Sequence, residues 1–434
     1  MTHRSVEVPV IARVEGEGAL HVAVEDGEIT DLRLEIYEPP RFFEAFLAGR
    51  RFDEVPDIVP RICGICPVAY QMSAVHGLEQ LFGMELPEGT HELRRLLYCG
   101  EWIESHVLHI FLLAAPDFLG FANAIEMATE HPELVKRALE IKRIGNDLMA
   151  AIGGREIHPV SPRVGGFSKA PRTRDLEPFL PRLEWALGEM PGIADFVASL
   201  PAPSYARPAE MVSMVHDSEY PITVGDMAST NGRRWDATTY ERVTHEVQVE
   251  HSNALHSLMS DTGTPYFLGP LARVNLNASL LTPVAREVAE RVGLRVPETD
   301  PFFSMAARAA EVTLAIEESI RIIDGYTAPD PPMVEPTPRA GRATWVTEAP
   351  RGTLYHRYEV DEGGRILEAK IIPPTSQNLR HMEEDLRGFL PGVLDRPDDE
   401  LTRLCEMVVR NYDPCISCAT HFLRLEIDRS SSGR

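Results

Sequence analysis

Two Cys-x-x-Cys motifs are the strongest chemical signal in this chain of 434 residues. The first reads RICGICP at 61–67, and the second reads DPCISCATH at 413–421. Two residues between cysteines allow both thiolates to reach one metal ion from a tight turn or a helix start. Thiolates bind soft or borderline metals such as zinc, nickel and iron. The sequence therefore predicts a metal site built from Cys63, Cys66, Cys415 and Cys418.

The spacing alone leaves a structural zinc site with four cysteine ligands open. Zinc ribbons usually hold their two pairs within a short stretch, whereas these pairs lie near opposite ends of the chain. Structural zinc also needs no flanking arginine, aspartate or histidine, and a chain of this size can bury a core without a metal. The flanks favour a catalytic metal.

The elements that must position these motifs are mostly helical. Alternating strands are predicted at 19–25 and 28–37 around an Asp26-Gly27 turn, and at 353–360 and 365–372 around a Gly-Gly turn. Apolar spacing predicts helices near 93–110, 132–152, 177–198, 238–260, 280–293, 303–325, 376–387 and 399–411. The Pro-rich stretch 327–338 predicts a long irregular connection. We expect an α+β fold, mostly α, with a large helical body and small antiparallel sheets near both ends.

At the two motifs the sequence strongly resembles the large subunits of nickel–iron hydrogenases. RICGICP and DPCxxCxxH are the first and last signatures of that family. Further segments similar to the family occur in order at 13–16, 41–44, 153–159, 164–166 and 348–352. The resemblance covers nearly the whole chain and implies one domain over 1–434.

The resemblance implies a Ni-Fe centre that splits or forms H2. Cys63 and Cys415 would be terminal nickel ligands, and Cys66 and Cys418 would bridge to an iron that carries CO and cyanide. Cys415 would accept the first proton, and Glu15 would carry it onward.

Three further roles follow from the resemblance. Arg351 would lie over the cyanides, where a guanidinium donates several hydrogen bonds. Asp413 would hold that arginine, or it would have only the turn-forming role of an Asp-Pro pair. Glu44 and His421 would form a second metal site. A carboxylate suits magnesium and an imidazole suits a softer ion, so Mg and Fe both stay open there.

Two positions depart from the family pattern. Tyr70 stands where many members have a histidine that hydrogen-bonds a bridging sulfur, and Ser105 stands where an aspartate is usual. Tyr70 or the nearby His76 could replace the missing hydrogen bond. The departures resemble the cytoplasmic multisubunit hydrogenases that exchange electrons with NAD(P); deazaflavin or sulfur compounds such as polysulfide are alternative acceptors.

Partners follow from the cysteine count. An iron–sulfur cluster usually needs four cysteines, and only Cys99 and Cys405 remain, which we expect to be small buried side chains. The sequence also contains no Gly-x-Gly-x-x-Gly fingerprint. We therefore expect a heteromultimer with diaphorase subunits and an iron–sulfur small subunit. The family also implies nickel-insertion factors and a maturation endopeptidase that removes residues 422–434.

Composition excludes other classes of function. The formal net charge of −23 argues against a nucleic-acid partner, which would need clustered lysine and arginine. No apolar run is long enough to predict a membrane span or a signal peptide, so we expect a cytoplasmic protein. Two other readings compete with the hydrogenase: the related complex I electron-transport subunit, which lacks the four cysteines, and a zinc-stabilised interaction protein.

Overall fold

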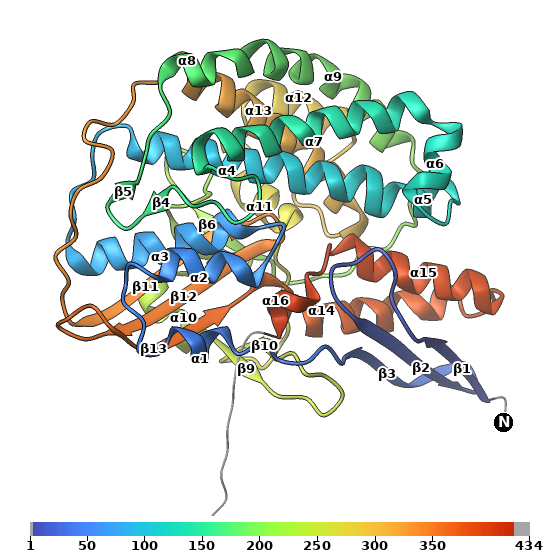
Figure 1. Ribbon diagram of the computed structural model, residues 1–434. Helices are drawn as coiled ribbons and strands as arrows, with labels where there is room; N and C mark the ends of the chain where they lie inside the picture. The colour runs from blue at the N-terminus through green and yellow to red at the C-terminus, as the bar shows by residue number, and fades with distance from the viewer. Residues whose placement is uncertain (1–2, 421–434) are drawn as a thin grey trace, which may run out of the picture.

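The computed structural model describes residues 3–420 (Figure 1). The chain begins with a three-stranded antiparallel sheet of β1 (His3–Val8), β2 (Gly18–Glu25) and β3 (Glu28–Ile36). Asp26 and Gly27 have φ angles of 50° and 87°, as the central residues of a type I′ hairpin turn require. The predicted strands and turn at this end are confirmed. His421 and the tail 422–434, to which a metal-ligand role and removal were assigned above, lie outside the described residues.

Helices form the largest part of the molecule, and several of the long ones fill the upper half of Figure 1. The long helices are α3 (Pro67–Phe82), α4 (Thr90–Val107), α7 (Pro132–Gly153), α9 (Leu180–Ser199), α13 (Ser304–Asp324), α14 (Pro374–Phe389) and α15 (Asp398–Asn411). Shorter ones are α1 (Phe43–Leu47), α2 (Val55–Ile58), α5 (Ala115–Leu119), α6 (Ala124–Glu130), α8 (Thr173–Leu176), α11 (Pro270–Asn277), α12 (Pro283–Arg291) and α16 (Ile416–Ala419). A π-helical segment, Leu108–Ala114, continues α4. The α+β fold class with a helical body is confirmed.

Close helix packing in this body depends on glycine. Gly100 of α4 faces Gly145 of α7, and a Cβ on Gly145 would lie 2.5 Å from the Gly100 carbonyl oxygen. A larger residue at either position would push the helices apart.

A second three-stranded sheet lies near the C-terminal end of the sequence. It consists of β11 (Gly341–Ala349), β12 (Gly352–Val360) and β13 (Ile366–Ile372), with β12 in the middle. The predicted β12–β13 hairpin is confirmed, whereas β11 was not predicted. The Pro-rich residues 327–338 contain no helix, and the chain reaches β11 through them.

The helix predicted over 238–260 is wrong. The segment contains α10 (Tyr240–Val243), followed by a hairpin of β9 (Thr244–Val247) and β10 (His256–Met259). Branched side chains at Thr244 and Val247 of β9 favour an extended backbone and override the apolar spacing. Short strands not predicted are β4 (Pro162–Arg163), β5 (Gly166–Phe167), β6 (Val212–Val215), β7 (Asp226–Ser229) and β8 (Arg234–Trp235).

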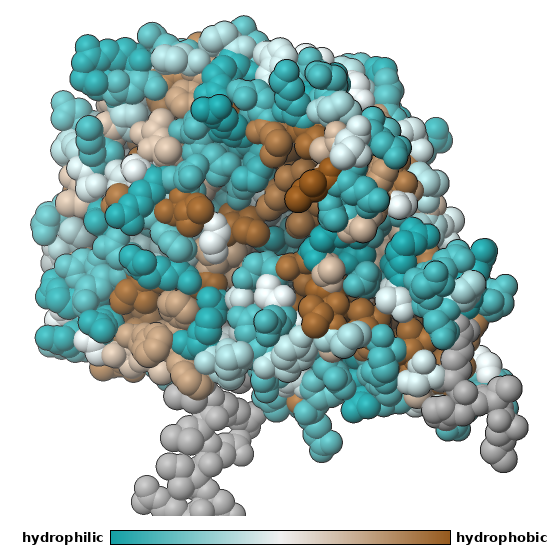
Figure 2. All heavy atoms as spheres, turned by 45° about the vertical axis from the view of Figure 1, so that its right-hand side comes forward, coloured by the Kyte–Doolittle hydropathy of each residue, from teal (hydrophilic) through white to brown (hydrophobic). Residues whose placement is uncertain are grey.

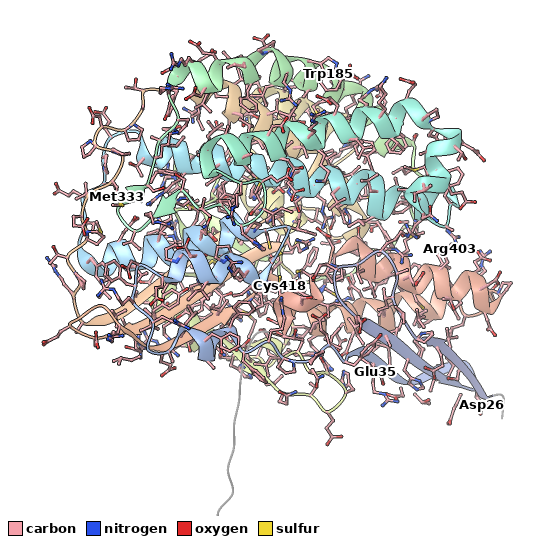
Figure 3. The ribbon with its side chains drawn as sticks, viewed as in Figure 1. Asp26, Glu35, Trp185, Met333, Arg403 and Cys418 are labelled. Atoms are coloured by element: carbon pink, nitrogen blue, oxygen red, sulfur yellow. The ribbon has the colours of Figure 1, made fainter. Side chains whose placement is uncertain are left out.

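The largest apolar cluster includes side chains from β1 through α16. Cys418 lies near the middle of Figure 3, whereas Asp26 and Trp185 lie near the edges of the molecule. Cys99 is fully buried in α4 and Cys405 in α15, and burial raises the pKa of both thiols to about 12. The expectation that these two cysteines are small buried side chains is confirmed.

Within residues 3–420, no single helix is long and apolar enough to cross a membrane. One pair bent by 74°, Thr90–Leu119 with Ala124–Glu130, satisfies length and composition only when its two parts are taken together.

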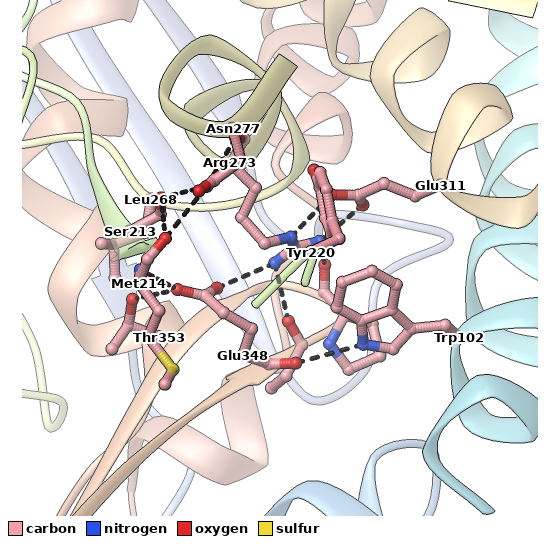
Figure 4. A network of polar contacts seen from close by, with 12 residues as sticks. Trp102, Ser213, Met214, Tyr220, Leu268, Arg273, Asn277, Glu311, Glu348 and Thr353 are labelled. Carbon is pink, nitrogen blue, oxygen red and sulfur yellow. Dashed lines mark hydrogen bonds and ion pairs between the residues drawn. The ribbon is translucent and has the colours of Figure 1, made fainter. Parts of the chain in front are cut away.

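A buried charge network joins α11, α13 and β11 (Figure 4). The Arg273 guanidinium donates two 2.7 Å hydrogen bonds to Glu311 and one of 3.1 Å to Glu348. It also donates to the carbonyls of Ala349 and Pro350, each at 2.9 Å. Because those carbonyls directly precede Arg351, the network fixes the backbone that carries this predicted site residue.

Candidate metal centre

The four motif cysteines meet in the interior. Cys63 follows a 3-10 turn, Val59–Ile62, and Cys66 directly precedes α3. Cys415 directly precedes α16, which contains Cys418. The Cys63 sulfur lies 2.9 Å from that of Cys66 and 3.7 Å from that of Cys415, and those of Cys63, Cys66 and Cys418 all lie within 4.8 Å of one another. Each of the four is at most 2% exposed. Cysteines from near the two ends of the sequence therefore form one buried sulfur cluster.

Arg41 holds the two motifs against each other. Its Nη2 donates to the Ile62 carbonyl at 2.7 Å and to the Ser417 carbonyl, so one guanidinium contacts both cysteine loops. Its backbone N–H donates to the Thr420 carbonyl at 2.7 Å. The sequence marked 41–44 as a family-like segment but gave Arg41 no role.

Glu15 lies directly beside Cys415. The Cys415 thiol donates to Glu15 Oε2 at 3.0 Å, and the Ser417 N–H donates to the same oxygen at 3.1 Å. The Glu15 carbonyl accepts from the Ile416 N–H at 2.8 Å, which aligns the two segments as a short parallel bridge. The structure therefore brings together two residues that are 400 positions apart.

Gly16 makes this approach sterically feasible. Its φ is +88°, and an added Cβ would lie 2.5 Å from Glu38 Oε2 and 2.7 Å from the Ile416 Cβ. Side chains rarely adopt that φ, so only glycine fits between the two segments. Glu38 Oε1 accepts a 2.6 Å hydrogen bond from the Ser417 hydroxyl. Glu38 was not predicted, because nothing in its local sequence distinguishes it from other polar residues at the end of a strand.

Arg351 and Asp413 form a buried ion pair at the cluster. Arg351 Nη2 donates to Asp413 Oδ1 at 3.0 Å, and Nε donates to the Asp413 carbonyl. Both side chains are about 3% exposed. Burial opposes the charge on Arg351, but Asp413 and then the cysteines raise the pKa of Arg351 well above its usual range. Arg351 Nη1 is buried with no hydrogen-bond partner among residues 3–420, so both of its N–H groups remain for a bound group.

The thiols cannot all ionise without a cation. Burial opposes ionisation of Cys63, but hydrogen bonds with Cys415, Cys418 and Cys66 lower its pKa well below the usual range. Burial raises the pKa of Cys415 and of Cys418 well above it. A hydrogen bond with Cys418 lowers the pKa of Cys66, but Cys63 and burial outweigh it and the net shift is strongly upward. Four thiolates together therefore require cations, which fits a metal centre.

Tyr70, one of the two departures from the family pattern, lies near the cluster. Burial and then the charges of Cys418 and Cys66 raise the pKa of Tyr70, but the Tyr70 hydroxyl has no hydrogen-bond partner among the described residues. His76 stacks on Trp345 at a ring distance of 5.3 Å. Neither side chain is hydrogen-bonded to a sulfur of the described residues. Ser105 is buried, and its hydroxyl is likewise unpartnered within residues 3–420.

Glu44, from the predicted second metal site, accepts the Ile371 N–H at 2.7 Å. It lies in the first turn of α1, three positions after Arg41, whose backbone binds Thr420. The structure thus brings Glu44 near Thr420, which is the last described residue and directly precedes His421 in the sequence.

Two residues that hydrogen-bond the backbone at or next to the cysteine motifs could not be recognised from the sequence. Thr375, at the start of α14, accepts the Cys415 N–H at 2.9 Å. Glu101 is fully buried and accepts the N–H groups of Val68 and Ala69 at 2.6 and 3.2 Å. It therefore satisfies the first turn of α3, which fixes the helix start beside Cys66.

Solved structures share this arrangement of helices and sheets. An NAD+-reducing [NiFe]-hydrogenase in the H2-reduced state superposes with a TM-score of 0.84 at 28% identity, covering 96% of this chain and 99% of that one. A fold this similar, around a buried cluster of four cysteines, defines the class as nickel–iron hydrogenase large subunits.

Sequence relatives agree. The alpha subunit of sulfhydrogenase 1 from Pyrococcus furiosus is 35% identical over 424 residues, which are 97% of this chain and 98% of the relative. The matching chain of the vhu F420-non-reducing hydrogenase from Methanococcus voltae is 30% identical over 415 residues, which cover 88% of this chain and 97% of that protein. The family description "Nickel-dependent hydrogenase" matches residues 41–138. The chain belongs to the nickel-dependent hydrogenase family, as the catalytic large subunit of an oxidoreductase that acts on H2.

Proposed function

We propose that this chain splits H2 heterolytically, and that the Cys415 thiol passes the proton to Glu15. The observation that carries the proposal is the 3.0 Å contact between the Cys415 sulfur and Glu15 Oε2. A thiol in direct contact with a carboxylate can transfer a proton without an intervening water. Beyond Glu15, the pair of Ser417 and Glu38 supplies the next polar groups toward solvent, because Glu38 is only partly buried.

Cys63, Cys66, Cys415 and Cys418 would hold the nickel–iron group. When bound, the group supplies Lewis-acidic metal ions that polarise H2 and accept its electrons. Arg351 would donate from its unpartnered Nη1 to the CO or cyanide ligands of the group. Asp413 would keep that guanidinium in place, since it binds Nη2.

Glu44 and His421 would hold the second metal. Support comes from the Arg41 backbone contact with Thr420, which brings the residue before His421 close to α1. Magnesium and iron remain the two candidate ions for a carboxylate and an imidazole.

Electrons must leave through a partner. The two cysteines outside the centre are buried in separate helices and cannot ligate a cluster. We propose an iron–sulfur small subunit that covers an apolar area near the centre. Figure 2 shows brown atoms gathered over parts of one face, and the exposed side chains of Tyr37, Phe42 and Phe46 flank Arg41 and Glu38 in the sequence. Apolar patches of this kind mark protein interfaces.

NAD(P), reached through diaphorase subunits, is the proposed final acceptor. The support is the likeness to the NAD+-reducing hydrogenase. Sulfur or polysulfide is the second candidate, because the relative from Pyrococcus furiosus is a sulfhydrogenase. Comparing H2-dependent reduction of NAD(P)+ and of polysulfide by the purified complex separates the two.

The test of the function is metal content and H2 uptake in the complex produced with nickel-insertion factors. We expect nickel and H2-dependent dye reduction in the wild type, and loss of both in Cys415→Ser, because one of the four thiolates is gone. Cys405→Ser, at a buried cysteine outside the cluster, should keep both. Intact mass of the active chain shows whether residues 422–434 have been removed. Nickel-free wild type with that tail removed would contradict the proposal.

Replacing Arg351 by lysine should lower the turnover rate with little loss of metal. Lysine keeps the positive charge beside Asp413 but cannot donate from Nη1 and Nη2 in a fixed fork. Loss of one preorganised donor in a buried site costs about 10²–10³ in rate. H2 oxidation kinetics and nickel content are measured together. Arg357→Lys, at a β12 arginine that pairs with Glu241 and Glu368, serves as the control. Equal H2 oxidation rates in Arg351→Lys and Arg357→Lys would show that Arg351 does not contribute to turnover.

A further inference from the structure

A second cluster of metal-binding side chain types lies outside the cysteine centre. His251, in the loop between β9 and β10, His256, at the start of β10, and Glu383, of α14, offer ligand atoms that all lie within 4.8 Å of one another. His251 Nε2 lies 2.8 Å from Glu383 Oε1. The two imidazole rings are 5.7 Å apart and nearly perpendicular.

The ion pair between His251 and Glu383 does not account for the burial of His256. Its side chain is fully buried, and neither ring nitrogen has a hydrogen-bond partner among residues 3–420. Buried polar groups are nearly always satisfied, so two unpartnered nitrogens in one ring point to a missing ligand.

We propose that His251, His256 and Glu383 bind a divalent transition metal, with Zn²⁺ as the best fit. Two imidazoles and one carboxylate are a common zinc ligand set, and imidazole favours zinc over magnesium. Zinc bonds of about 2.0–2.2 Å place neighbouring tetrahedral ligand atoms about 3.3–3.6 Å apart, so the three side chains need only small adjustments.

The surroundings would hold a bound ion in place. Glu383 Oε1 also accepts the Leu34 N–H of β3 at 3.0 Å, so a bound ion would join β3, α14 and the β9–β10 loop. The same loop is attached to β3 through Asn253, whose N–H donates to the Ile36 carbonyl at 2.7 Å. The His251 side chain is 17% exposed and provides the entry route. Arg380 lies 3.4 Å from Glu383 Oε2 and also pairs with Glu384, so it can turn aside when a cation binds.

The test uses the holoenzyme, whose cysteines are occupied, after dialysis against a mild chelator. Zn²⁺ binding is measured by equilibrium dialysis with elemental analysis, together with X-ray absorption at the zinc edge. We expect one zinc per chain with nitrogen and oxygen ligands, and a higher unfolding temperature with Zn²⁺ than with Mg²⁺.

Two variants and a control make the assignment specific. His256→Phe keeps a buried ring but removes one ligand. His251→Ala removes a partly exposed ligand, so this variant still tests the site if His256→Phe fails to fold. Both should lose the zinc, whereas His245→Ala, at an exposed histidine of β9, should retain it. Absence of bound zinc in the wild type, sulfur in its coordination shell, or zinc retained by His251→Ala would each overturn the proposal.

Discussion

Glu15→Gln should lower turnover in both directions by about 10²–10⁴, the usual contribution of a positioned proton-transfer group. Glutamine is nearly the same size and can still accept the Ser417 N–H, so the local backbone contacts should survive. It cannot take up and release a proton at Cys415. The variant should therefore contain normal amounts of nickel and iron while its rates of H2 oxidation and evolution collapse.

Isotope exchange isolates the proton step. Exchange between H2 and D2O solvent requires protons to leave the centre, so it should fall with turnover in Glu15→Gln. Glu17→Gln is the matched control, because Glu17 is exposed and contributes its backbone N–H to Glu38. Glu15→Asp keeps the acid but shortens its reach, and it should recover part of the rate. Exchange at the wild-type rate in Glu15→Gln would show that protons leave by another route.

The chemistry of the centre could be predicted from the sequence because it is local to the motifs. Each Cys-x-x-Cys pair signals a metal ligand by its spacing, and the likeness of its flanks to a known family suggested the roles of Glu15 and Arg351. Arg41 shows what spacing cannot give. Its guanidinium contacts the carbonyls of Ile62 and Ser417, which come from distant parts of the chain. Such a role becomes visible only when the fold brings those carbonyls together.

The fold was predictable where one periodicity dominated. The N-terminal hairpin has both alternation and an Asp26-Gly27 turn, so its signals agree. The segment 238–260 has apolar residues at helical spacing, but its branched residues and the pairing of β9 with β10 favour an extended backbone. The stacking of Tyr240 on Tyr355 at 4.5 Å is a long-range contact that also fixes this region. Tertiary contacts of this kind are not encoded in a local window.

The largest stability effect is expected from Arg273→Leu. Arg273, Glu311 and Glu348 are all fully buried, and the guanidinium also lies 4.6 Å from the centre of the Trp102 ring. Removing the arginine that binds both carboxylates leaves two buried acids without their main counter-charge. Breaking a buried pair in this way costs about 3–5 kcal/mol. The free energy of unfolding, measured by urea denaturation of the variant and the wild type, should fall by that amount.

Arg321→Leu is the control for loss of an arginine in general. Arg321 is 54% exposed and pairs with Glu92 and Glu318 at the surface, so its loss should cost at most about 1 kcal/mol. Arg273→Lys should lie between the two, because lysine restores the charge but not the fork that binds Glu311 twice. If Arg273→Leu were as stable as Arg321→Leu, the network would not stabilise the fold.

Arg273→Leu should also affect activity at the metal centre. Arg273 binds the carbonyls of Ala349 and Pro350, so its loss frees the backbone that positions Arg351. Arg273→Leu should therefore lose H2-dependent activity at urea concentrations where the chain is still folded, whereas Arg321→Leu should lose activity only as it unfolds. Coincident loss of activity and structure in both variants would mean that Arg351 is positioned by Asp413 alone. An early loss confined to Arg273→Leu would show that the buried charge network supports the fold and also orients the arginine at the centre.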